Sequence, residues 1–167
     1  MGGIVRLRES TGLGDPCHPE HVRYQRVGAR RLDLAGALSS ASVARAWIWG
    51  HLAEKHMSAD QAHVVVLLTS ELVTNALTHS KSRHGEVTVL LQVSQYCVRV
   101  DVMDDGSAGG PVLGPTRVDA ENGRGLVLVD QLAHRWGDYF EASGRAVWFE
   151  VERQLPAGNG AIFEHAS

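Results

Sequence analysis

Residues 70–79 read SELVTNALTH, which is the most informative stretch of the sequence. Its apolar residues recur at spacings of three and four, which is the period of a helix with a buried side. Glu71 and Asn75 lie four residues apart, so on a helix both side chains share one face, with His79 one turn further along. A carboxylate and an amide placed in this way suit a base beside a metal ligand, although both residue types are also common on solvated helix faces.

The surrounding pattern extends this helix over residues 58–78. Ser58 followed by Gln61 is typical of a capping box at a helix start. An earlier helix is expected over residues 39–55, with a serine as its N-cap. Because the second helix is apolar on most sides, its carboxylate–amide pair must face a cavity or a partner, since unpaired burial of polar groups is costly.

Downstream, the period changes to the alternation of half-buried strands. A two-residue connection predicts that the strands over residues 86–93 and 96–102 form an antiparallel hairpin. Further strands are expected near residues 24–34, 135–140 and 145–151. Early helices followed by antiparallel strands and one late helix predict an α+β fold, a two-layer α/β sandwich. Its sheet would be mixed but mainly antiparallel, with about three helices on one face.

Asp104-Asp105-Gly106 falls where the second hairpin strand enters a glycine-containing loop. A carboxylate at this point can accept a hydrogen bond from an amino group, such as the exocyclic amine of adenine. Gly106 would let the chain turn beneath a flat ring, because glycine tolerates close contacts. An ordinary Asp-Gly turn has the same sequence, so both interpretations stay open.

Gly123-Arg124-Gly125-Leu126 precedes a short helix that is expected to end near residue 133. Free backbone N–H groups and the positive dipole end of a helix form an anion site, and glycines let phosphate oxygens approach. The spacing is neither that of a Walker A loop nor that of a Rossmann fingerprint. A simple hinge before a helix remains the alternative.

Composition limits the class of protein. The 167 residues favour one domain over residues 23–153, between a flexible N-terminal arm (1–22) and a flexible C-terminal tail (154–167). A net charge of -3 argues against nucleic acid as the main partner. Two cysteines cannot form a disulfide framework, the nine histidines lack zinc-site spacing, and no apolar run could span a bilayer. We expect a cytoplasmic protein.

The order of these motifs resembles the GHKL (Bergerat-fold) ATP-binding family, over roughly residues 24–152. The stretch at 71–79, together with Trp136-Gly137 and Gly144-Arg145-Ala146-Val147-Trp148, looks most like the anti-sigma factor serine/threonine kinase branch of actinobacterial regulators. The resemblance implies ATP and Mg²⁺ as cofactors and Glu71 as general base. It implies that Asn75 holds the Mg²⁺ and that Asp104 binds the adenine amine. The full nucleotide-binding set would be Asn75, His79, Asp104, Gly106, Gly123, Arg124, Gly125 and Leu126.

The function implied is that of an ATP-binding regulatory protein. It would be an anti-sigma factor that binds a sigma factor and phosphorylates an anti-sigma antagonist, with no direct contact to nucleic acid or membrane. The resemblance is also compatible with a homodimer.

The alternative is a catalytically weak or inactive binding module of the same fold. Two departures favour it: Ala108 replaces the second glycine of Asp-x-Gly-x-Gly, and Ala146 stands where the branch usually has a hydroxyl that supports the aspartate. A histidine-kinase catalytic domain is a third, less favoured interpretation, because the chain is short for an additional dimerisation helix pair.

Overall fold

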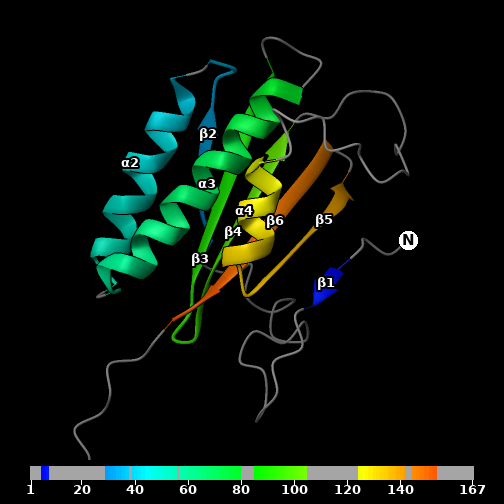
Figure 1. Ribbon diagram of the computed structural model, residues 1–167. Helices are drawn as coiled ribbons and strands as arrows, with labels where there is room; N and C mark the ends of the chain where they lie inside the picture. Colours follow the sequence, from blue (N-terminus) through cyan, green and yellow to red (C-terminus); the bar gives the residue numbers. More distant parts are fainter. Residues whose placement is uncertain are drawn as a thin grey trace, which may run out of the picture.

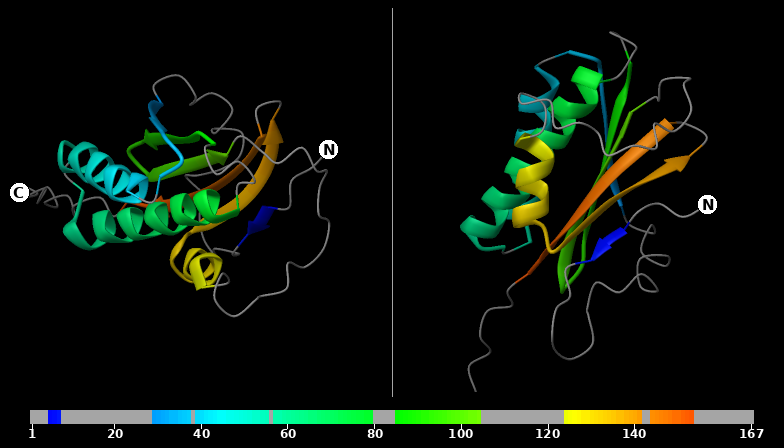
Figure 2. Two further views of the ribbon diagram at one scale, coloured as in Figure 1. Left: turned by 90° about the horizontal axis from the view of Figure 1, so that it is seen from above. Right: turned by 45° about the vertical axis from the view of Figure 1, so that its right-hand side comes forward.

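The computed structural model describes residues 5–7, 29–37, 39–55, 57–79, 85–104, 124–141 and 144–153. These residues form two layers, a six-stranded sheet and a layer of helices on one of its faces (Figure 1). The helices are α2 (Ser40–Ala53), α3 (Ala59–His79) and α4 (Arg124–Leu132). Figure 2 shows all three on the same side of the sheet. The α+β two-layer prediction is therefore confirmed.

The strands are β1 (Val5–Leu7), β2 (Arg30–Leu34), β3 (Val87–Val93), β4 (Cys97–Asp104), β5 (Arg135–Glu141) and β6 (Gly144–Glu152). Their order across the sheet is β1-β5-β6-β4-β3-β2. Every pairing among these described strands is antiparallel, so they lack the parallel component that a mixed sheet would have. At the start of β6, Gly144 has a φ of 141°, a conformation that side-chain-bearing residues rarely adopt.

Alternation in the strands builds the core between the layers. The odd-numbered residues of β3 and the even-numbered residues of β4 point toward the helices, as do Val147, Phe149 and Val151 of β6. They pack against the buried stripes of the helices, which include Ile48, Leu52, Leu68, Leu72 and Val129. The strand residues between them point to the opposite face of the sheet, which we call the outer face.

The helix boundaries agree closely with the sequence prediction. The backbone N–H of Gln61 donates to Oγ of Ser58 at 3.3 Å, and the Ser58 hydroxyl donates to Oε1 of Gln61 at 3.2 Å. The serine therefore caps α3 as expected. The amide of Gln61 also donates to the carbonyl of Glu152 at 2.8 Å, which ties the start of α3 to the end of β6.

The predicted arm and tail fall mostly outside the described residues. Within the arm, Val5–Leu7 departs from the expectation of a flexible segment, because it forms β1 and pairs with Arg135–Gly137 of β5. The strand expected at residues 24–34 is described only from Arg30 as β2, which pairs with β3 at the other edge of the sheet.

Candidate functional site

Four chain segments converge at one end of the sandwich, the upper end in Figure 1. They are the C-terminal half of α3, the N-terminus of α4, the end of β4 and the start of β6. This convergence follows from topology, because α3 and β4 run toward that end whereas α4 and β6 run away from it. The elements that carry the predicted motifs therefore meet at one place.

Glu71 and Gly125 are in direct contact across the α3–α4 interface. A Cβ atom added at Gly125 would lie 3.0 Å from Oε2 of Glu71 and 3.4 Å from its Cβ. Any side chain at position 125 would therefore press on the carboxylate. The glycine lets the first turn of α4 approach a half-buried Glu71, which joins two motifs that are far apart in the sequence.

Asn75 lies one turn beyond Glu71 on α3 and is also half-buried. His79 is the last residue of α3, and its side chain lies outside the described residues. On α4, Leu126 packs against the core, whereas the side chain of Arg124 is not described. Gly106, Gly123 and Ala108 lie outside the described residues.

Asp104 is the last residue of β4 and is half-buried. Because side chains alternate along a strand, it shares the helix-facing side with Val102, which is part of the core. Its side chain thus points to the face of the sheet that α3, which carries Glu71 and Asn75, covers. A carboxylate acceptor, an amide and a second carboxylate, together with a helix N-terminus, can recognise a ligand that has an amino group and an anionic group.

The expectation about Ala146 is wrong, and the strand register gives the reason. Ala146 pairs with Met103, not with Asp104, and it is buried on the outer face of the sheet. The residue directly across from Asp104 is Arg145. The missing hydroxyl at position 146 therefore removes nothing from the surroundings of Asp104.

Arg145 of β6 forms an ion pair with Asp138 of the neighbouring strand β5. Its Nε donates to Oδ2 of Asp138 at 3.1 Å, and Nη2 lies 3.0 Å from the same oxygen. The sequence prediction did not include either residue in the site. Alternation along the strand puts Arg145 on the same face as the half-buried Val147. That Asp104 is its neighbour follows only from the register between β4 and β6, which the sequence does not show.

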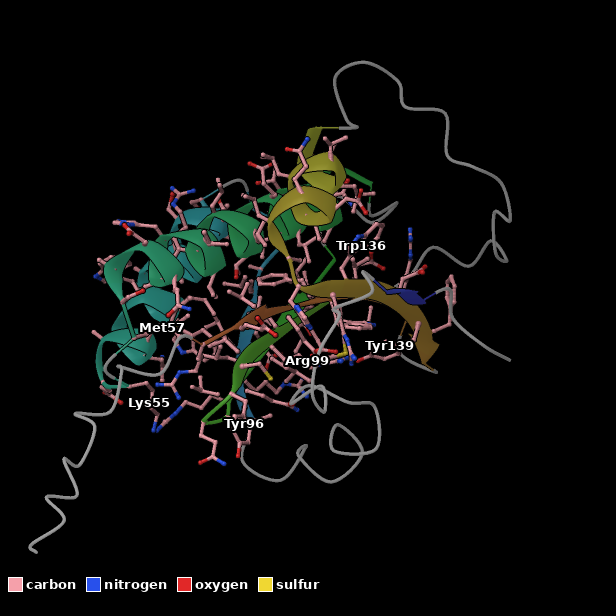
Figure 3. All side chains as sticks on the ribbon, turned by 60° about the horizontal axis from the view of Figure 1, so that its bottom comes forward. Lys55, Met57, Tyr96, Arg99, Trp136 and Tyr139 are labelled. Atoms are coloured by element: carbon pink, nitrogen blue, oxygen red, sulfur yellow. The ribbon has the colours of Figure 1, made fainter. Side chains whose placement is uncertain are left out.

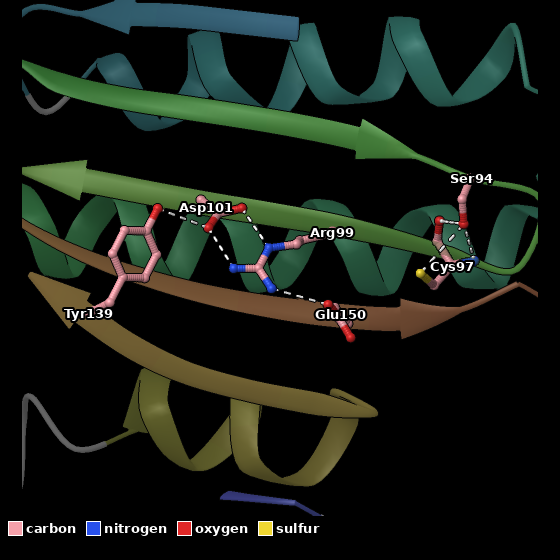
Figure 4. A network of polar contacts seen from close by, with 6 residues as sticks. All are labelled: Ser94, Cys97, Arg99, Asp101, Tyr139 and Glu150. Atoms are coloured by element: carbon pink, nitrogen blue, oxygen red, sulfur yellow. Dashed lines mark hydrogen bonds and ion pairs between the residues drawn. The ribbon is translucent and has the colours of Figure 1, made fainter. Parts of the chain in front are cut away.

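The outer face carries a separate polar network (Figure 4). Arg99 donates to both oxygens of Asp101 at 2.9 Å and to Oε1 of Glu150 at 3.1 Å, and the Tyr139 hydroxyl donates to Asp101 at 3.2 Å. The guanidinium of Arg99 also lies 4.0 Å from the ring centroid of Trp148. Figure 3 places Arg99 and Tyr139 on the side of the sheet away from the helices, and Trp136 on the helix side.

Burial and ion pairing act in opposite directions on the pKa values of Glu150 and Arg99. Burial raises the pKa of Glu150 above its ordinary value, and the charge of Arg99 offsets only part of this effect. Burial also tends to lower the pKa of Arg99, but its hydrogen bonds and charge interactions with Asp101 and Glu150 outweigh burial and raise it. The network lies across the sheet from Glu71 and Asn75, so it supports the sheet and not the candidate site.

The fold and the converging motifs define an ATPase-type domain. The chain belongs to the family of histidine kinase-like ATPase domains, whose model matches residues 34–151. This membership confirms the resemblance to the GHKL family and implies ATP binding. Among the described residues, no helix is long and apolar enough to cross a membrane.

The chain is 41% identical over 89 residues to the uncharacterized protein SCO4941 of Streptomyces coelicolor, a match that covers 50% of this chain and 85% of that protein. It is also similar to the crystal structure of the RsbU and RsbW domains of Rv1364c from Mycobacterium tuberculosis, with a TM-score of 0.59 and 20% identity. That likeness covers 77% of this chain but only 33% of the Mycobacterium chain, and it supports the fold alone.

Proposed function

We propose that this protein is an ATP-binding regulator, an anti-sigma factor with serine/threonine protein kinase activity toward an anti-sigma antagonist. The observation that carries the proposal is the contact of Glu71 with Gly125, with Asn75 one turn further on the same helix. The membership of the histidine kinase-like ATPase family supports nucleotide binding, and the resemblance of residues 71–79 to the anti-sigma branch supports the kinase. The partners would be a sigma factor and the antagonist, in the cytoplasm.

The residues present suit Mg²⁺ and a nucleotide. The amide oxygen of Asn75 is a ligand of the kind that Mg²⁺ accepts, and the N-terminus of α4 beside Gly125 would offer backbone N–H groups to phosphate oxygens. Asn75 would hold the metal ion, and Asp104 would receive the amine of adenine. When bound, ATP would supply the phosphoryl group, and Mg²⁺ would neutralise the charge of the phosphates.

Glu71 would act on the protein substrate. Its carboxylate would accept the proton of a seryl or threonyl hydroxyl, which makes the hydroxyl oxygen a better nucleophile. The contact with Gly125 restricts where the carboxylate can lie, since the first turn of α4 borders it on one side.

Two measurements test the proposal. Titration calorimetry with Mg-ATP should give saturable binding, and incubation with candidate antagonists should transfer the terminal phosphate. Glu71→Gln should lower phosphotransfer by about 10²-fold or more, because a positioned base contributes about 10²–10⁴-fold. It should change ATP affinity little, and the exposed Glu86→Gln should change neither property. Absence of binding at millimolar Mg-ATP would contradict the proposal.

The same variant separates the kinase from a binding module of the same fold. If the protein is a pure binder, the wild type shows no phosphotransfer and Glu71→Gln keeps the cellular effect. If it is a kinase, Glu71→Gln loses its effect on the antagonist. With Ala146 on the outer face, one of the two features that favoured the inactive module no longer bears on the nucleotide site.

A further inference from the structure

Asp104 and Arg145 are cross-strand partners at the end of the sheet that holds the candidate site. They pair directly in the β4–β6 register, one pair beyond Met103 and Ala146. Directly opposed residues of antiparallel strands have Cβ atoms about 4.5–5.5 Å apart and project to the same face. That face is the helix side, because the next residues of this face, Val102 and Val147, pair with each other and contact the core.

Asp138 fixes the direction of the Arg145 guanidinium. Both Nε and Nη2 are directed at Oδ2 of Asp138, at 3.1 and 3.0 Å. An arginine has five N–H donors in a rigid plane, so this pair leaves the Nη1 donors outside it. The side chain of Arg145 is 46% exposed and that of Asp138 is 25% exposed, so the guanidinium is open to solvent and does not lie within the core.

Asp104 and Arg145 therefore offer an acceptor and a donor from directly opposed positions on neighbouring strands, and the guanidinium leans toward Asp138 of β5. The edge of adenine presents the complementary pair, an amine donor next to the ring nitrogen N1, which is an acceptor. We propose that Arg145 is a specificity-determining residue that donates a hydrogen bond to this ring nitrogen while Asp104 accepts from the amine. The inference deepens the proposed function and rests on the nucleotide binding proposed there.

A second arginine–aspartate ion pair, on β2, serves as a control for a purely structural role of Arg145. Arg31 and Asp33 form a similar ion pair on β2, with Nε of Arg31 2.9 Å from Oδ1 of Asp33 and with both side chains more than half exposed. This pair lies on the outer face, because its neighbours Leu32 and Leu34 point to the helices. Exposed ion pairs contribute little to stability, so Arg31→Ala is the matched control.

The test compares ATP with 1-deaza-ATP, in which a C–H group replaces N1 and the amine is kept. The wild-type protein should bind ATP about tenfold more tightly than 1-deaza-ATP, as expected for one hydrogen bond to a charged donor. Arg145→Ala should bind ATP about tenfold more weakly than wild type and should no longer distinguish the two nucleotides. Arg31→Ala should behave as wild type.

Two results would overturn the inference. The first is an ATP affinity of Arg145→Ala equal to that of the wild type. The second is an equal loss of affinity for ATP and for 1-deaza-ATP, since Arg145 would then act on the phosphates or on the fold. Asp138→Asn, which leaves Arg145 in place but loosens it, should give an intermediate loss for ATP only. Failure of the wild-type protein to bind ATP at all would instead contradict the proposed function, so the two failures are distinguishable.

Discussion

At the scale of single residues, the backbone of Gly125 can approach the Glu71 carboxylate closely because residue 125 has no side chain. The Cβ of Gly125→Ala would meet Oε2 of Glu71 at 3.0 Å, so the carboxylate must move. The end of a flexible side chain moves at low energetic cost, so we expect little change in the unfolding temperature. Phosphotransfer should fall about tenfold or more, because a misplaced base is a poor proton acceptor. Kinetic assays and thermal melts together check this outcome.

Gly50 in α2 provides the control. A Cβ there would meet nothing within 4 Å, and the residue is exposed on a helix. Gly50→Ala should leave phosphotransfer unchanged and raise the free energy of unfolding by about 1 kcal/mol, because alanine favours helices. Equal activity losses in both variants would show that the Gly125 effect is not local to Glu71.

The contact between Glu71 and Gly125 could not be predicted from the sequence, although both residues could. Periodicity places Glu71 and Asn75 on one face of a helix, and the glycines mark the start of the next helix. Which helices are neighbours depends on packing through the core, and nothing local encodes it. For the same reason, the family resemblance suggested position 146 as the support of Asp104, whereas the register makes Arg145 the direct neighbour.

At the scale of elements, the two long helices begin with serines that differ in their contacts. Ser58 accepts a hydrogen bond from the backbone of Gln61 at the start of α3. Ser39 occupies the N-cap of α2 but makes no side-chain cap hydrogen bond. Ser58→Ala should therefore lower the free energy of unfolding by about 1 kcal/mol, the usual contribution of a cap. Ser39→Ala should change it by much less.

Chemical denaturation of the two variants checks this prediction. A larger loss in Ser39→Ala than in Ser58→Ala would contradict it. The three helices and the strands β3 to β6 were predictable within a few residues because their apolar periods are regular. The three-residue β1 was not, because so short a strand has no period and forms only by pairing with β5.

At the scale of the whole molecule, the outer face joins three strands through buried charges. Arg99 of β4 links Asp101 on its own strand to Glu150 of β6, and Tyr139 of β5 also bonds to Asp101. Alternation alone predicts that these polar residues face water, yet the side chains of Asp101 and Glu150 are only 5% and 1% exposed. Burial on this face depends on the complete fold, so the sequence pattern could not reveal it.

The buried carboxylate of Glu150 makes stability depend on pH. Its pKa lies above the ordinary value of 4.5 in the folded protein because burial disfavours the charged form. The folded state therefore binds this proton more tightly than the unfolded state. The resulting stabilisation is complete below pH 4.5 and is lost as the pH rises through the folded-state pKa. A tenfold difference in proton affinity between the two states corresponds to about 1.4 kcal/mol.

Glu150→Gln removes this titration and nearly preserves the shape of the side chain. The free energy of unfolding of the wild-type protein minus that of Glu150→Gln should thus decrease as the pH rises above 4.5, and should then level off. Denaturant melts at a series of pH values measure this difference. A difference that increases with pH would mean that pairing with Arg99 outweighs burial, so that the ion pair and not desolvation dominates the outer face.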